Sequence, residues 1–141
     1  MSDLESAIAL SIAAHRGQVD KGGQPYILHP LRVMLQLESD SERIVAVLHD
    51  VVEDNQEYTM SRLESLGYSR EILEALDCLT RRPEENYNEF VGRIKLNRLA
   101  TRVKLADLED NMDIRRLAGL STVDYGRLQK YRKVWGELKS L

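Results

Sequence analysis

Apolar residues recur three and four positions apart along most of this chain, which is the spacing of one face of an α-helix. The first stretch of this kind follows a capping box formed by Ser2 and Glu5 and extends to about His15. Glycine and proline then interrupt the pattern between residues 17 and 28, in GQVDKGGQPYIL, which predicts a loop. The first part of the chain is therefore expected to be one amphipathic helix followed by a long turn.

The helical pattern resumes at His29 and continues, with short breaks, to the C-terminus. Pro30 suits the first turn of the second helix, and we expect Ser41 or Asp40 to cap the third. The helices expected after the loop lie at about residues 29–37, 39–54, 59–67, 69–79, 86–96, 99–112 and 121–141. No alternation typical of a β-strand reaches a useful length. The sequence therefore predicts an all-α fold, a single-domain helical bundle over residues 1–141.

The last expected helix is strongly polar but carries an apolar stripe. The residues of this stripe are Leu128, Tyr131, Trp135 and Leu138. Their spacing favours a helix that covers the core of its own domain over an oligomer interface. The sequence does not otherwise define an oligomeric state.

The composition is that of a globular protein, with 43% hydrophobic and 30% charged residues. The formal net charge of −3 argues against general nucleic-acid binding, which usually requires a basic excess. The single cysteine, Cys78, excludes a disulfide within the chain and a multi-cysteine zinc site. The first residues are unlike a secretory signal, and no apolar run approaches the roughly 20 residues of a membrane span. We therefore expect a cytoplasmic protein without membrane association.

The stretch VLHDVVED, residues 47–54, places one histidine and three carboxylates among apolar residues. With His49 at 0° on a helical wheel, Glu53 falls at about 40°. Asp50 and Asp54 follow at about 100° and about 140°, while the apolar residues occupy the opposite side. One face of this helix is thus suited to a core, and the other carries four groups that bind protons or metal ions.

Carboxylates gathered on one face repel each other, and in a half-buried site this repulsion is severe unless a cation offsets it. A divalent metal does so directly, and a combination of imidazole and carboxylate suits Mn²⁺, Fe²⁺, Zn²⁺ or Mg²⁺. The alternative is a solvated acidic face with a histidine nearby. The stretch by itself leaves both interpretations open.

Two other expected helices carry candidate ligands, His29 and Asp107. His29 stands at a helix start in PYILHPLRV, where a purely structural role is the alternative. Asp107 follows an apolar run in VKLADLEDNM, which places it toward the core. An unpaired buried aspartate costs several kcal/mol, so Asp107 requires either a metal or a basic partner such as Arg102 or Lys104.

Four motifs in order, AHRGQ, KGGQPYILHP, VLHDVVEDN and KLADLEDNM, give the chain a family resemblance. Together they resemble the HD-domain hydrolases, in particular the hydrolase domain of the bifunctional alarmone synthetase-hydrolases and the stand-alone small alarmone hydrolases. The match covers about residues 5–117, and the helix at 121–141 completes the domain. The resemblance implies an HD-type helical domain that removes pyrophosphate from the 3′ position of ppGpp or pppGpp.

The same resemblance implies a metal site and residues that act beside it. The implied ligands of one divalent ion, most often Mn²⁺, are His29, His49, Asp50 and Asp107. Glu53 and Asp54 match the acidic pair that positions and activates the attacking water. Asn111 matches an asparagine that lies near the nucleotide.

Cations are needed to hold the pyrophosphate, and four residues are candidates for substrate binding. They are Lys21, Lys104, Arg81 and Arg82, each with a solvated surface charge as the alternative. Tyr26 and His15, beside the glycine loop, are expected to be packing residues. Asp20 stands where the family carries an arginine against the guanine base, and a carboxylate cannot replace that planar cation. The base preference is therefore a separate question from the metal site.

We therefore expect a metal-dependent phosphohydrolase whose partner is a small nucleotide, an alarmone or an analogue. One alternative is an HD phosphomonoesterase, which would release orthophosphate instead of pyrophosphate. A second alternative is a module that senses a nucleotide without turnover. Glu53 and Asp54 argue against the second, because a sensor has no need of both.

Overall fold

A computed structural model describes residues 3–141, and this part of the chain is helical without any β-strand. A single isolated bridge joins Val19 and Pro25 in the glycine loop. The helices are α1 (Leu4–His15), α2 (Leu28–Leu35), α3 (Asp40–Asp54), α4 (Met60–Ser65), α5 (Arg70–Leu79), α6 (Tyr87–Lys95), α7 (Arg98–Asn111), the short 3₁₀ helix η1 (Ile114–Arg116) and α8 (Thr122–Lys139). The predicted all-α bundle is confirmed, and its arrangement agrees with an HD-type domain.

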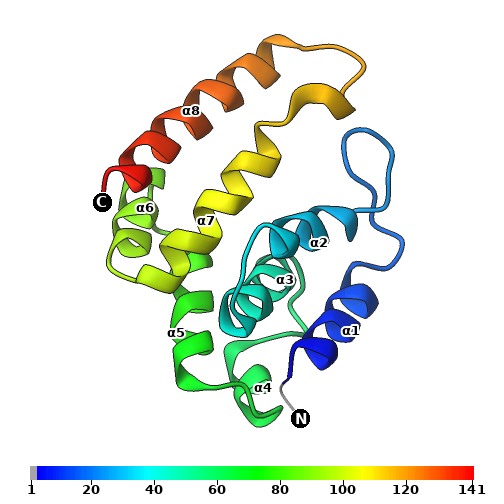
Figure 1. Ribbon diagram of the computed structural model, residues 1–141, viewed down its shortest axis with the longest axis vertical. Coiled ribbons are helices and arrows are strands. Elements are labelled where there is room, and N and C mark those ends of the chain that lie inside the picture. Colours follow the sequence, from blue (N-terminus) through cyan, green and yellow to red (C-terminus); the bar gives the residue numbers. More distant parts are fainter. Residues whose placement is uncertain (1–2) are drawn as a thin grey trace.

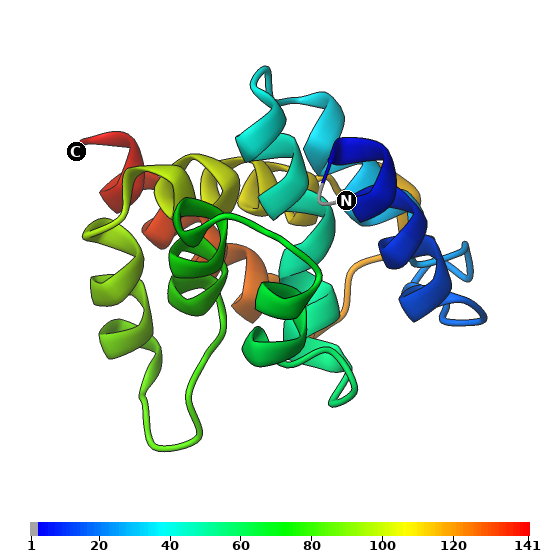
Figure 2. The same cartoon turned by 90° about the horizontal axis from the view of Figure 1, so that it is seen from below.

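Helix α3 is the central element of the bundle. It packs against α1, α2, α5 and α7, as Figures 1 and 2 show from two directions. Its middle part is buried on all sides, because every residue from Ile44 to His49 is buried, as is Val51. The polar end of α3, with Asp50, Glu53 and Asp54, emerges from this core near the start of α2 and the middle of α7.

The helix starts follow local capping chemistry. Ser69, Asn86 and Ser121 cap α5, α6 and α8 as expected, each accepting a hydrogen bond from a backbone N–H in the first turn. The expectation for α3 was wrong, since its cap is Ser39. Ser39 Oγ accepts the Glu42 N–H and the Glu42 carboxylate accepts the Ser39 N–H.

The start of α1 differs from the expected capping box. Ser2 lies outside the described residues, and Asp3 caps the helix by accepting the Ser6 N–H at 2.8 Å. The end of α1 at His15 is as predicted. The glycine loop begins directly after it.

Helix α8 lies along α7 and closes one side of the core (Figure 1). Leu138 is buried, and Tyr131 and Trp135 are partly buried against the core, which confirms the expected role of the apolar stripe. Within the described residues no helix is both long enough and apolar enough to cross a membrane.

The glycine loop packs against the segment between α7 and α8. A Cβ on Gly22 would lie 3.0 Å from the carbonyl oxygen of Arg116, a tight contact that would require the Arg116 backbone to shift by a few tenths of an ångström. Asp20 Oδ1 accepts the N–H groups of both Gly22 and Gln24 at 2.9 Å. Asp20 therefore stabilises the turn of the loop, a role that the motif comparison did not suggest.

Replacing Ser39 with alanine should lower the free energy of unfolding by about 1 kcal/mol, because it removes the side-chain half of the α3 capping box. The matched control is Ser41→Ala, two residues later inside the helix, which should stay within about 0.5 kcal/mol of the parent protein. Urea denaturation measures both values. Equal losses from the two variants would contradict Ser39 as the cap.

Candidate metal centre

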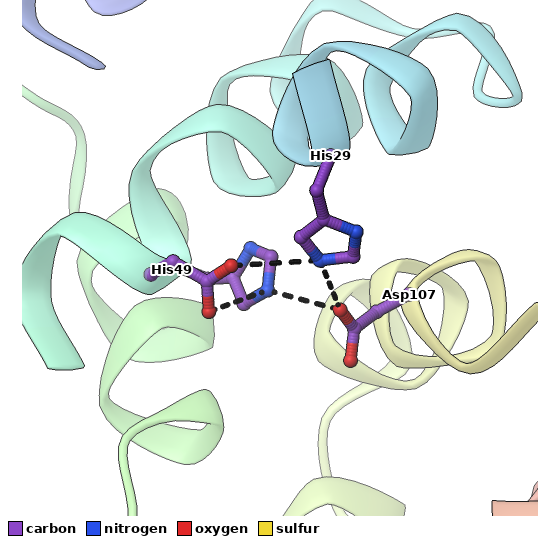
Figure 3. Close-up of side chains that lie close together, drawn as sticks. His29, His49 and Asp107 are labelled. Carbon is purple, nitrogen blue, oxygen red and sulfur yellow. Dashed lines mark hydrogen bonds and ion pairs between the residues drawn. The ribbon is translucent and has the colours of Figure 1, made fainter. Parts of the chain in front are cut away.

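Two histidines and two aspartates from three helices converge on one point. The four residues are His29 at the start of α2, His49 and Asp50 on α3, and Asp107 on α7. One potential ligand atom from each lies within 4.8 Å of all the others. Figure 3 shows the side chains of His29, His49 and Asp107 pointing toward one another. The sequence prediction that these residues meet is thus supported by the geometry.

The shortest contacts in this cluster join imidazole nitrogens to carboxylate oxygens. Asp107 Oδ1 lies 2.9 Å from His29 Nε2 and 3.4 Å from His49 Nε2. Asp50 completes the cluster, with Oδ2 at 3.5 Å from His29 Nε2 and Oδ1 at 3.2 Å from His49 Nε2. The Nε2 atoms of both rings therefore face the same small volume.

Hydrogen bonds on the far side of each ring fix this orientation. His49 Nδ1 donates to the carbonyl oxygen of Ala46 at 2.7 Å, and a carbonyl can only accept. His29 Nδ1 lies 2.6 Å from Asp110 Oδ2, which accepts in the same way. When neutral, both rings therefore carry their lone pair on Nε2 and direct it inward.

Asp110 is a buried carboxylate to which the sequence pattern assigns no role. Its hydrogen-bond partners are His29 and Arg32 at the carboxylate and Arg116 at the backbone. Arg32 donates to both oxygens of Asp110, at 2.8 and 3.1 Å. Arg116 donates to its backbone carbonyl oxygen at 3.0 Å. Burial opposes the charged form, but the bonds from His29 and Arg32 outweigh it and lower the pKa of Asp110 to about 2.

The carboxylates also set the charge of the two imidazoles. Burial disfavours the imidazolium form of His29, but the hydrogen bonds to Asp107 and Asp110 outweigh this and raise its pKa to about 10. Burial likewise opposes the charge on His49, while Asp50 and Asp107 raise its pKa to about 9. The site thus attracts positive charge strongly, whether carried by protons or by a metal ion.

Asp107 has a third neighbour of positive charge, Lys104. The Lys104 ammonium donates to Asp107 Oδ2 at 3.1 Å, leaving Oδ1 for the two histidines. Burial opposes ionisation of Asp107, yet Lys104 and the imidazoles hold its pKa well below the usual range. Arg102, the other partner considered for Asp107, pairs instead with Glu42 at 3.6 Å.

Tyr26 contacts the cluster in addition to the packing role expected for it. Its hydroxyl donates to Asp50 Oδ2 at 2.7 Å. Its ring also packs on His15, with the centroids 5.0 Å apart, and His15 Nδ1 lies 3.0 Å from Gln18 Oε1. The tyrosine therefore both packs the loop and orients a carboxylate, and only the second function was missed.

Glu53 and Asp54 lie one turn beyond His49 and Asp50, on the exposed end of α3. Loss of hydration and the Asp50 carboxylate raise the pKa of Glu53, and the same two causes raise that of Asp54. Both groups are therefore better proton acceptors than free carboxylates.

A pocket of about 280 Å³ opens beside His29 and Tyr26. It lies between the glycine loop, the segment around η1 and the start of α8. Lys21 and Asn111, two of the residues that the sequence offers for substrate binding, line it. Asn111 Nδ2 also lies 3.4 Å from Asp107 Oδ1, so this side chain reaches from the pocket to the cluster.

The two arginines predicted to bind substrate lie in the connection between α5 and α6, away from this pocket. Arg82 pairs with Asp77 at 3.3 Å and is exposed. Arg81 bonds the backbone carbonyl of Glu85 and lies near the ring of Tyr87. The structure does not bring Arg82 to the cluster.

The donor set fits a divalent cation. Two inward-facing imidazole nitrogens and two carboxylates are ligands that Mn²⁺, Fe²⁺ and Zn²⁺ accept. His49 Nε2 is buried and has no hydrogen-bond partner among the described residues, so its lone pair is available to a ligand of the cluster. His29 could bind through Nε2 while Asp110 holds its Nδ1, and Asp107 through Oδ1 while Lys104 holds its Oδ2.

No family model matches the chain. Three curated proteins match most of it. It is 36% identical over 113 residues to the guanosine-3′,5′-bis(diphosphate) 3′-pyrophosphohydrolase of Haemophilus influenzae, which covers 70% of this chain and 16% of that protein. It is 31% identical over 122 residues to the bifunctional (p)ppGpp synthase/hydrolase SpoT of Escherichia coli, covering 77% and 17%. The GTP pyrophosphokinase of Myxococcus xanthus is 29% identical over 129 residues, covering 77% and 16%.

The chain thus spans less than a fifth of the length of these relatives, at 16% to 17%. The matches nevertheless cover most of the chain, and the resemblance drawn from its four motifs is confirmed. This chain is therefore related to the guanosine-3′,5′-bis(diphosphate) 3′-pyrophosphohydrolases, through a segment of those longer proteins.

Proposed function

We propose that this protein is a metal-dependent phosphohydrolase that removes pyrophosphate from the 3′ position of an alarmone-like nucleotide. The single observation that carries the proposal is the convergence of His29, His49, Asp50 and Asp107 within 4.8 Å. Two relatives are named a 3′-pyrophosphohydrolase and a synthase/hydrolase, which supports the same reaction. The third relative is named for a pyrophosphokinase, so the names alone do not define the activity of the shared segment.

The four residues would hold one divalent ion, for which we propose Mn²⁺. Nitrogen and hard oxygen donors in equal number suit Mn²⁺ at least as well as Zn²⁺, which more often takes histidine and cysteine. When bound, the ion supplies Lewis acidity that makes water more acidic and offsets charge on phosphoryl oxygens. The fixed Nδ1 hydrogen bonds of the two histidines keep the ligand atoms in place for it.

The side chains at the exposed end of α3 would carry out the proton transfer. Water attacks the phosphorus bonded to the ribose 3′ oxygen, and Glu53 takes the proton that this water loses. The bond from phosphorus to the 3′ oxygen then breaks, so that pyrophosphate leaves and the ribose oxygen regains a proton. Asp54 orients the water beside Glu53, and the raised pKa of both groups suits this role.

The pocket beside His29 would receive the nucleoside. Its volume of about 280 Å³ is close to the lower limit of small-molecule sites, which matches part of a nucleotide. Lys21 and Asn111 supply the polar contacts from two sides of this pocket. Asp20 Oδ1 accepts two backbone hydrogen bonds within its own loop. The preference of the pocket for one nucleotide base would therefore depend on other residues that line it.

Two alternatives differ in their products. An HD phosphomonoesterase would release orthophosphate, and a sensing module would release nothing. Incubation with ppGpp, ppApp and common nucleotides in the presence of Mn²⁺, followed by product analysis, separates the three functions. Pyrophosphate as the product supports the proposal, and orthophosphate alone or unchanged nucleotide contradicts it.

His49→Ala should abolish both metal binding and turnover, because it removes an inward-facing ligand. The matched control is His15→Ala, which also deletes a buried imidazole but leaves the cluster intact. Metal content measured by mass spectrometry, together with the rise in melting temperature on adding Mn²⁺, reports the binding. An equal metal content in the two variants would exclude His49 as a ligand.

Asp110→Asn should weaken Mn²⁺ binding roughly 10- to 100-fold, because the partner of a ligand histidine sets its orientation and basicity. Asp113→Asn, three residues later, removes a half-buried carboxylate that pairs with Arg115 outside the cluster and should leave the affinity unchanged. Competition with a fluorescent chelator measures both constants. If the affinity of Asp110→Asn equals that of the control, the carboxylate has no part in holding His29.

Glu53→Gln should retain the metal and lower kcat by about a hundredfold or more, since the amide cannot accept a proton. Glu64→Gln on α4, also exposed, is the matched control and should keep the parent rate. Metal content and steady-state kinetics are measured on the same samples. A wild-type rate for Glu53→Gln would show that another group takes the proton.

A further inference from the structure

A cluster of cations surrounds the aromatic pair Tyr87 and Phe90. The Lys130 ammonium on α8 lies 3.8 Å from the centre of the Tyr87 ring. The Arg81 guanidinium lies 5.9 Å from the same ring. Lys104 lies 5.7 Å from the Phe90 ring, whose centroid is 6.1 Å from that of Tyr87. Three separate segments of the chain thus bring positive charge to one aromatic pair.

Lys104 is paired with Asp107, but the charges of Lys130 and Arg81 are poorly neutralised. Among the described residues, no carboxylate lies within ion-pair distance of Lys130 or Arg81, and Arg81 is held only by the backbone carbonyl of Glu85. Partial burial and the neighbouring Arg81, Lys104 and Arg127 lower the pKa of Lys130, as mutual repulsion between cations requires. A protein tolerates such repulsion where an anion binds.

The cluster is connected to the metal centre through Lys104. Its ammonium contacts Asp107 Oδ2 at 3.1 Å, and its side chain keeps 14% of its surface exposed. Lys104 lies one turn before Asp107 on α7, whereas Asn111 lies one turn after it and lines the nucleoside pocket. Lys104 and Asn111 therefore flank Asp107 in the two directions along α7.

We infer that Lys130 and Arg81, with Lys104, bind the terminal phosphate of a 3′-diphosphate and so select diphosphate over monophosphate substrates. This inference rests on the proposed function. With the nucleoside in the pocket and the attacked phosphorus at the metal centre, the second phosphate must extend away from the pocket, toward Lys104. Lys130 was not among the cations expected from the sequence, because its helix lies outside the four motifs.

The chemistry of the cluster suits this ligand. A terminal phosphate carries the highest charge density of the substrate, and flexible ammonium groups bind it as point charges. A monophosphate ends at the metal centre and does not reach Lys130. The contribution of the cluster to binding should therefore appear for pyrophosphate and be absent for orthophosphate.

The test uses inorganic pyrophosphate and orthophosphate as probes, titrated into the Mn²⁺-treated full chain by calorimetry. Lys130→Gln should lower the pyrophosphate affinity roughly tenfold and leave the orthophosphate affinity unchanged. Lys130→Arg should keep the affinity, since it preserves the charge. The matched control is Lys133→Gln, an exposed lysine on the same helix, which should change neither affinity. Equal losses for both anions, or equal losses in Lys130→Gln and Lys133→Gln, would overturn the inference.

Turnover of the same variants separates the inference from the proposed function. If the parent protein hydrolyses a nucleotide 3′-diphosphate, Lys130→Gln should lower kcat/KM for it and not for the 3′-monophosphate. Turnover with a pyrophosphate affinity that does not depend on Lys130 would refute the inference and keep the function. A Lys130-dependent pyrophosphate affinity without any nucleotide hydrolysis would keep the anion site and refute the function.

Discussion

The ionised carboxylate of Asp107 is the constraint on which the rest of the structure depends. It is 4% exposed, and a buried charge of this kind is tolerated only where positive charge surrounds it. Helix α2 supplies His29, α3 supplies His49, and α7 itself supplies Lys104. Whatever cation completes the group therefore also holds three helices together, which links the stability of the bundle to occupation of the site.

Two further features of the fold determine where the acidic side chains of α3 and the pocket lie relative to this carboxylate. The buried centre of α3 fixes where Asp50, Glu53 and Asp54 emerge, because its middle residues cannot shift without opening the core. The glycine loop and η1 approach each other closely at Gly22 and form one wall of the nucleoside pocket. The proposed ligands thus come from helices of the core, while the proposed substrate contacts come from loops and the exposed face of α8.

The sequence predicts the helices and the residues of the His–Asp cluster well, because both leave local patterns. The apolar period located the helices, and the motifs around His29, His49 and Asp107 identified the cluster. What it could not predict depends on contacts between distant positions. His29 and Asp110 are 81 residues apart, and nothing beside Asp110 indicates this partner.

Distant contacts also explain the outcomes for Tyr26 and Arg82, one of which joins the cluster unexpectedly while the other lies outside it. Tyr26 reaches Asp50 from a loop 24 residues earlier, so its hydroxyl is part of the cluster although its surroundings suggest packing. Arg82 has the charge of a substrate ligand, but Asp77 on the preceding helix pairs with it at the surface. The Ser39 cap of α3 is different, because the spacing of Ser39 and Glu42 was visible in the sequence and was misread.

The most direct test of the metal centre is anomalous X-ray diffraction from crystals of the full chain grown with Mn²⁺ and measured at the manganese absorption edge. The account predicts one strong anomalous peak bounded by both Nε2 atoms and by oxygens of Asp50 and Asp107. A map without density at that point, or with manganese bound only elsewhere on the surface, would contradict it.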